Sequence, residues 1–237
     1  MNNMKKYLER IYQKSFNDYC HLLKNNLKNN HLSFVVTVNP ETLMSDDNLI
    51  KKLLLDKRSS LVADGIAVVR ACKKLKINVK QRITGIDLAE FLLEEANKQK
   101  KSLYLFGAKE DVLNKLVKII NAKYQNINLV GYSHGFAENK DQVMKEIIKL
   151  QPDICLVALG IPLQEKLIYE NLKYAKKGIF MGVGGSFDVL SGHKKRAPKL
   201  MRKLNLEWLY RIVKEPKRFK KFYKNNIKFL KKIKKMK

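Results

Sequence analysis

The sequence predicts an α/β fold with a parallel-rich sheet, followed by a basic helical C-terminal appendage. Short β-rich apolar runs alternate with stretches of helical spacing, which is typical of a parallel sheet covered by helices. The chain has 237 residues, 45% of them apolar, which is enough to build a core. Residues 194–237 hold 19 Lys and Arg against 2 acidic residues, net +17, whereas residues 1–193 carry net +10. We therefore expect a globular core in residues 1–193 and a cationic appendage in residues 194–237.

Six apolar runs are predicted to be the strands of this sheet. They are residues 34–38, 61–63, 102–106, 127–131, 154–159 and 178–182. Apolar residues three and four positions apart predict covering helices between them. These helices are expected over residues 46–55, 66–72, 87–99 and 111–124.

Small and polar residues follow most of the predicted strands. They are TVNPE (37–41), ADG (63–65), GA (107–108), GIPLQE (160–165) and GVGGSFD (182–188). In open α/β sheets ligands bind beyond the carboxyl ends of the strands. These residues are therefore the candidates for a functional site.

Two glycine-rich turns, residues 160–164 and 182–188, are candidates for binding a phosphate or pyrophosphate. A helix that starts after a glycine exposes backbone N–H groups at its positive end. The alternative is that the glycines only permit tight turns. Neither turn has the spacing of a P-loop or the full dinucleotide fingerprint, which favours a nucleotide other than NAD. The predicted nucleotide-binding residues are Gly107, Gly160, Pro162, Gln164, Gly184, Gly185, Ser186 and Asp188.

Asp64 follows a predicted strand, where a carboxylate could act as a general base on an acceptor hydroxyl. The alternative is that it caps the following helix, and spacing alone favours capping. Thr37 and Asn39 could contact a sugar, although an Asn-Pro pair also starts turns. The aspartate pair Asp46-Asp47 has the pattern of a helix cap, and the four histidines lack other ligand residues at metal-binding spacing. We therefore expect no metal.

The appendage contains a predicted basic amphipathic helix. Its apolar residues at helical spacing are Phe219, Phe222, Tyr223, Ile227 and Leu230, surrounded by lysines and arginines. Such a helix can lie on an anionic membrane, dock on its own domain or contact nucleic acid, and the aromatic content favours the membrane. The alternative is a solvated Lys-rich end. No run is long enough to span a bilayer and no secretory signal is apparent, so we expect a cytoplasmic protein, peripheral on the cytoplasmic face of the plasma membrane.

Seven ordered motifs between about residue 32 and about residue 220 closely resemble the WecG/TagA/CpsF glycosyltransferases, family 26. They are TVNPE (37–41), ADG (63–65), RITGIDL (82–88), LGIPLQEK (159–166), GVGGSFD (182–188), KRAP (195–198) and LEWLYR (206–211). The resemblance implies a Rossmann-like catalytic core. It also implies transfer of a sugar from a UDP-sugar donor to an acceptor linked to undecaprenyl diphosphate. The TagA branch uses N-acetylmannosamine and lipid-linked N-acetylglucosamine, on the way to wall teichoic acid.

The resemblance also implies roles for particular residues. Asp64 matches the proposed base, and Thr37, Asn39, Arg82 and Gln164 match residues that line the site. Arg211 and Arg218 match appendage arginines thought to close over the diphosphate as UDP departs. Lys221 stands where the family often has a third arginine, and a lysine supplies charge without a bidentate fork. No cofactor is expected, because the UDP-sugar is a substrate and cations of the chain offset the charge of the leaving group.

Two alternatives belong to other classes. An NAD(P)-dependent oxidoreductase would share the doubly wound sheet. This sequence, however, lacks the acidic residue and the glycine spacing of the dinucleotide-binding fingerprint. A nucleic-acid-binding protein rests on charge alone, with no recognisable motif, so we expect no nucleic acid. The sequence leaves open which sugar is transferred, and whether the chain forms a homo-oligomer.

Overall fold

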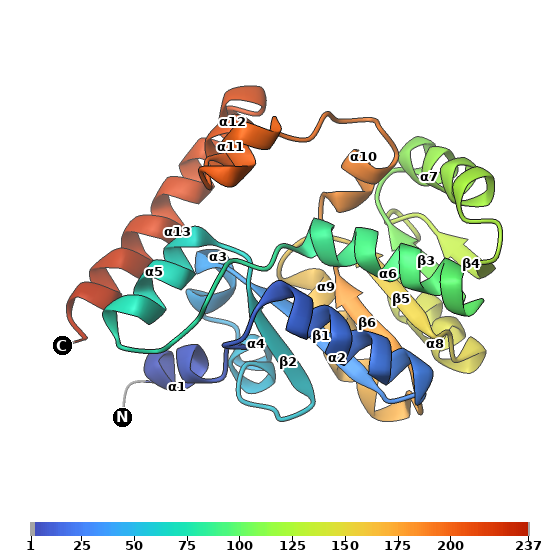
Figure 1. Ribbon diagram of the computed structural model, residues 1–237, viewed down its shortest axis with the longest axis horizontal. Coiled ribbons are helices and arrows are strands. Elements are labelled where there is room, and N and C mark those ends of the chain that lie inside the picture. The colour runs from blue at the N-terminus through green and yellow to red at the C-terminus, as the bar shows by residue number, and fades with distance from the viewer. Residues whose placement is uncertain (1–2, 237) are drawn as a thin grey trace.

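The structure is a computed structural model that describes residues 3–236, with the side chains of Arg218 and Lys221 excepted. Its centre is a sheet of six parallel strands in the order β2-β1-β6-β5-β3-β4 (Figure 1). The strands are β1 (Ser33–Val38), β2 (Ser59–Ala63), β3 (Ser102–Gly107), β4 (Asn128–Ser133), β5 (Ile154–Ala158) and β6 (Ile179–Gly182). All six predicted strands are therefore confirmed, with ends shifted by at most two residues. Apolar runs identified them because strands inside a parallel sheet are buried on both faces, although the edge strand β4 is only half-buried.

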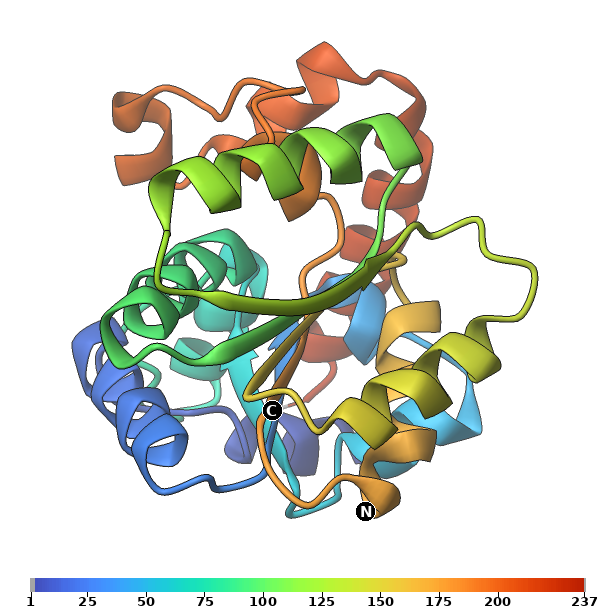
Figure 2. The same ribbon diagram turned by 90° about the vertical axis from the view of Figure 1, so that its right-hand side faces the viewer.

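Helices cover both faces of the sheet (Figure 2). One face carries α1 (Asn3–Glu9), α3 (Pro40–Leu43), α4 (Asn48–Leu53), α5 (Ile66–Lys74), α8 (Lys140–Leu150) and α9 (Leu163–Asn171), which is followed by the 3-10 turn η1 (Leu172–Tyr174). The other carries α2 (Phe16–Lys28), α6 (Gly85–Gln99), α7 (Glu110–Lys123) and α10 (Ser186–Leu190). The four predicted helices are confirmed as α4, α5, α6 and α7.

Neighbouring strands send the chain to opposite faces of the sheet at its carboxyl edge. After β1 the chain passes to the face that carries α3, whereas after the neighbouring β6 it passes to the face that carries α10. The neighbours β5 and β3 diverge in the same way, toward α9 and α7. Such divergence is where ligands bind in open α/β sheets. The predicted site motifs after these four strands therefore lie at the carboxyl edge, where the chain diverges to the two faces.

The appendage folds as α11 (Lys199–Lys203), α12 (Glu207–Lys214) and α13 (Lys217–Lys234). Helix α13 runs beside α3 and α5, the helices that follow β1 and β2 (Figure 1). Phe229 and Ile233 of α13 are buried in the same core cluster as residues of β1 and β2. The end of the appendage thus contributes to the core, and the boundary at residues 193/194 does not separate two hydrophobic cores.

The apolar residues of α13 form two faces instead of the predicted one. Phe222 stacks on Trp208 of α12, with ring centroids 5.0 Å apart, and continues toward the buried Phe229. Phe219, Tyr223 and Leu230 are exposed on another face. The lysine-rich composition marked this helix as amphipathic but did not show that one apolar face is used for docking on the core.

Replacing Phe229 by Ala should destabilise the protein by about 3–5 kcal/mol, because this fully buried ring leaves a cavity between α13 and the core. Leu230→Ala on the same helix, where the side chain is 52% exposed, should change the free energy of unfolding by no more than about 0.5 kcal/mol. Urea unfolding of both variants measures the difference. Equal effects would show that α13 does not dock on the core.

Within the described residues, no helix combines the length and the apolar character needed to cross a bilayer. The three cysteines, Cys20, Cys72 and Cys155, are free and buried.

Candidate active site

Asp64 lies at the carboxyl end of β2, and its backbone N–H donates to the carbonyl of Val38 at 3.0 Å. The capping alternative is wrong, because the N-cap of α5 is Gly65 and no side chain caps this helix. The pKa of the Asp64 carboxyl is raised, and burial is the largest cause of this shift. The cations of Arg211 and Arg82 act in the opposite direction. A partly shielded carboxyl with an elevated pKa is suited to accept a proton.

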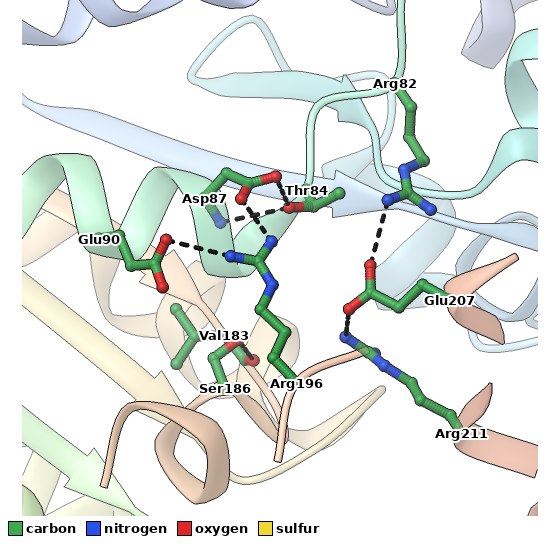
Figure 3. Close-up of polar contacts among 9 residues, drawn as sticks. All are labelled: Arg82, Thr84, Asp87, Glu90, Val183, Ser186, Arg196, Glu207 and Arg211. Carbon is green, nitrogen blue, oxygen red and sulfur yellow. Dashed lines mark hydrogen bonds and ion pairs between the residues drawn. The ribbon is translucent and has the colours of Figure 1, made fainter. Parts of the chain in front are cut away.

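Arg82 reaches the same edge from the loop that precedes α6. The N–H of Ile83 donates to the carbonyl of Ala63 at 2.8 Å, which fixes this loop beside the end of β2. Arg82 then donates through Nη2 to Oε2 of Glu207 at 3.1 Å. Arg211, one turn further along α12, donates through Nη2 to Oε1 of the same carboxylate at 2.8 Å (Figure 3). The structure therefore brings together predicted residues from the core and the appendage.

Thr37 and Asn39 lie at the end of β1 and the start of α3. Thr37 is buried, and a Cβ on Gly85 would approach its methyl carbon to 3.3 Å, so it packs against the start of α6. Asn39 caps α3, because its Oδ1 accepts from the N–H of Thr42 at 3.1 Å. The turn-starting alternative for Asn39 is confirmed, and its side-chain oxygen is occupied within the chain.

Gln164 is almost completely buried and joins the two glycine-rich turns. Its Oε1 accepts from the N–H of Gly160 at 3.1 Å and from the N–H of Gly184 at 3.0 Å. Its Nε2 donates to Oε1 of Glu165 at 2.7 Å. A phosphate could bind the amides of Gly160 and Gly184 only after these hydrogen bonds open. In this structure Gln164 sets the distance between the turns.

The other predicted nucleotide-binding residues also lie at the carboxyl edge. Gly107 has a φ of 125° and lies so close to β5 that a Cβ would clash with the carbonyl oxygen of Ala158. Pro162 follows a cis peptide bond and precedes α9. Gly185 and Ser186 open α10, where the Ser186 hydroxyl donates to the carbonyl of Val183 at 2.7 Å.

Asp188 belongs to the first turn of α10, where its carboxylate pairs with Lys194 at 3.3 Å. The predicted roles of these residues toward a nucleotide stay predictions. The side chains of Arg218 and Lys221 fall outside the described part of the chain, so their predicted place at the diphosphate also stays a prediction. Among the described residues, no group of three His, Cys, Asp or Glu side chains is arranged to hold a metal.

Two contact points between the appendage and the core were not predicted (Figure 3). Glu207 joins Arg82 to Arg211, as described above. Arg196 donates through Nη1 to Oε2 of Glu90 at 3.1 Å and through Nη2 to Asp87, both on α6. The partners are more than 100 residues apart in the sequence, so no local pattern indicates them. The one available signal was that Glu207 and Arg196 lie within motifs already singled out, LEWLYR and KRAP.

This arrangement combines a partly shielded carboxylate with two guanidinium groups at one edge of the sheet. The carboxylate can take a proton from a nucleophile, and the guanidinium groups can offset negative charge that develops on a leaving phosphate. Together they suit a transfer reaction in which an anionic group departs.

Comparison with known proteins agrees with these features. The profile described as "Glycosyl transferase WecG/TagA/CpsF family" matches residues 7–237, a wider range than the motifs cover. The sequence is 40% identical over 210 residues to the N-acetylglucosaminyldiphosphoundecaprenol N-acetyl-beta-D-mannosaminyltransferase of Bacillus subtilis (strain 168), covering 87% of this chain and 80% of that protein.

Proteins with the same name show similar agreement in other bacteria. The protein of Bacillus spizizenii is 34% identical over 85% of this chain and 79% of its own length. The protein of Staphylococcus aureus (strain MW2) is 36% identical over 78% of this chain and 73% of its own length.

Proposed function

This chain belongs to the WecG/TagA/CpsF family of glycosyl transferases, and from that premise we propose that it transfers N-acetylmannosamine from UDP-N-acetylmannosamine to undecaprenyl-diphosphate-linked N-acetylglucosamine. The names of three similar proteins support this acceptor and this sugar. The product would enter the synthesis of wall teichoic acid or a related surface polysaccharide. The oxidoreductase alternative finds no support among the relatives.

The observation that carries the proposal is that Asp64 ends β2 while Arg82, from the loop fixed beside that strand end, shares the Glu207 carboxylate with Arg211, so that both cations act on the Asp64 carboxyl. In the proposed mechanism Asp64 accepts the proton of the acceptor hydroxyl as its oxygen attacks the anomeric carbon. The bond from this carbon to the UDP oxygen breaks, and the electron pair leaves with UDP. A single displacement inverts the configuration at that carbon.

The leaving group carries its negative charge on a diphosphate. Arg82 and Arg211 each use one guanidinium N–H for Glu207 and retain further donors for phosphate oxygens. We propose that these cations, with Arg218 and Lys221, replace a divalent metal in neutralising the departing UDP.

A donor panel tests this function directly. Purified enzyme is incubated with a lipid-diphosphate-GlcNAc analogue and with UDP-ManNAc, UDP-GlcNAc or UDP-glucose, in the presence of EDTA, and the products are resolved by mass spectrometry. We expect a disaccharide from UDP-ManNAc with EDTA present. No product from any donor, either with EDTA or after addition of excess Mg²⁺ or Mn²⁺, would contradict the proposed function, whereas product only after addition of these ions would contradict the metal-independent mechanism alone.

We also propose that the appendage binds an anionic membrane, where the lipid-linked acceptor resides, on the cytoplasmic face of the plasma membrane. The exposed Phe219, Tyr223 and Leu230 lie among the lysines of α13. Exposed apolar side chains also project from α11, α12 and the turn between them; they are Leu200, Leu204, Leu209 and Val213. Apolar insertion and attraction to anionic lipid act together on such a surface.

Replacing Phe219 and Leu230 together by Ser should weaken binding to vesicles that contain phosphatidylglycerol by about tenfold or more, since each buried apolar side chain stabilises by about 1.5–3 kcal/mol. The fold should persist, because both side chains are exposed. Vesicle co-sedimentation measures the effect. Tyr174→Ser, also exposed but in η1, is the control, and an equal loss in both variants would contradict membrane binding through α13.

A further inference from the structure

We propose that Glu207 is a positioning residue that holds Arg82 of the core and Arg211 of α12 together beside Asp64. Docking of α12 and assembly of the cationic site would then be one event. The inference deepens the proposed glycosyl transfer and rests on it. Nothing in the names of the relatives assigns a role to this carboxylate.

The geometry of Glu207 is that of a bridge. Its side chain is 6% exposed, and each carboxylate oxygen accepts from a different arginine, Oε2 from Arg82 and Oε1 from Arg211. Arg82 belongs to the loop before α6, whereas Arg211 and Glu207 belong to α12 (Figure 3). Truncation of this side chain, as in Glu207→Ala, would therefore release both guanidinium groups at once and remove this ionic link between α12 and the core.

A carboxylate is needed at this place for an electrostatic reason. Two guanidinium groups close together repel each other, and a shared anion between them offsets that repulsion. An arginine has five N–H donors, and Arg82 and Arg211 each use one of them for Glu207. The remaining donors can serve the diphosphate, so Glu207 can orient the arginines without consuming them.

A second ionic contact also docks the appendage on the core. In this contact the basic residue belongs to the appendage and the acidic residues belong to the core. There, Arg196 of the segment leading to α11 pairs with Asp87 and Glu90 of α6. At one contact the appendage thus supplies the acidic residue and the core the basic one, and at the other contact the signs are reversed. This reciprocal pattern fixes which way the segment docks, because sliding it would place like charges opposite each other.

Glu207 also affects Asp64 through its charge. Burial raises the pKa of Asp64 most, Arg211 and Arg82 lower it, and Glu207 and Asp87 raise it. Replacing Glu207 by Gln removes one of the groups that raise this pKa and retains a side chain of the same shape. The pKa of Asp64 should fall, so the acid limb of the pH–rate profile should move to lower pH. A residue that only supports the fold would not move this limb.

The test compares Glu207→Gln and Glu207→Ala with the matched control Glu215→Gln. Glu215 follows α12, and its carboxylate pairs with Lys194 at 3.0 Å, so the control makes the same change of charge in the same appendage. We expect kcat to fall about tenfold in Glu207→Gln and about 10²-fold in Glu207→Ala. A displacement of a catalytic group by about 1 Å can lower the rate about 10²-fold. We expect the acid limb to move to lower pH in Glu207→Gln. The control should remain within about twofold of wild type, with its acid limb unchanged.

A second readout does not depend on transfer. Trp208 is the single tryptophan of the chain and follows Glu207 directly, stacked on Phe222 of α13. Its fluorescence therefore reports on how α12 packs against α13, the helix whose Phe229 and Ile233 dock on the core. We expect acrylamide to quench Trp208 more strongly in Glu207→Ala than in wild type or in Glu215→Gln.

The two readouts separate failure of this inference from failure of the proposed function. If the wild type transfers sugar and Glu207→Gln keeps its kcat and its pH profile, the inference is wrong. If the wild type transfers nothing, the proposed function fails, and the quenching of Trp208 then decides the inference. Unchanged quenching in Glu207→Ala would overturn it.

Discussion

Replacing Asp64 by Asn is expected to lower kcat by about 10²–10⁴, the usual cost of losing a general base, while UDP remains bound. The amide keeps the shape of the side chain but cannot accept the proton of the acceptor hydroxyl. The melting temperature should stay the same or rise. The reason is that a carboxyl with a raised pKa destabilises the folded state at neutral pH, where it is charged. Steady-state kinetics, UDP calorimetry and thermal unfolding measure the three quantities.

The control for Asp64→Asn is Asp141→Asn, a matched change at an exposed position in the first turn of α8. It should leave kcat within about twofold of wild type. Activity of Asp64→Asn within a few-fold of wild type would remove Asp64 from the mechanism. Loss of activity accompanied by a lower melting temperature would instead indicate a structural role.

Replacing Arg211 by Ala should lower kcat by about 10²–10³, the cost of removing one preorganised donor from a developing anion. Arg211→Lys should recover part of this loss, because a lysine supplies charge without the guanidinium fork. Binding to vesicles should change little, since the exposed apolar face of α13 remains.

Lys214→Ala is the matched control for Arg211→Ala, because it removes one exposed cation from the same helix. It should have little effect on turnover. If Lys214→Ala lowered kcat as much as Arg211→Ala, the net charge of α12 would matter and the position of Arg211 would not.

The sequence predicted the sheet well because five of its six strands are almost entirely buried, the edge strand β4 being the exception. A short, continuous apolar run such as residues 34–38 is typical of a strand buried inside a parallel sheet. The structure agrees, because β1 is buried along its whole length. The carboxyl ends of these runs then indicated which polar residues share an edge. Asp64 was found in this way, although spacing alone favoured a capping role that the structure assigns to Gly65.

The contacts that complete the site were beyond the sequence, because they join segments far apart. Arg82 and Glu207 are 125 residues apart, and no periodicity links them. Gln164 shows a second limit. Its side chain serves two glycine amides within the chain, and only the folded structure reveals that these donors are already occupied.

The appendage shows a third limit of the sequence. Abundant lysines in α13 indicated a surface helix, and they obscured the buried pair Phe229 and Ile233 that docks it on the core. Composition measures the average character of a helix, whereas docking depends on one narrow face.

The pH dependence of kcat/KM tests the central claim, that Asp64 beside Arg82 and Arg211 is the base. The carboxylate must be unprotonated to act, so activity should rise with pH through the pKa of Asp64, and this limb should lie above the ordinary aspartate value of 3.8. Arg82→Gln should move the limb to higher pH, because that cation lowers the pKa of Asp64. A limb at the same pH in both enzymes, or no acid limb in the wild type, would contradict the account.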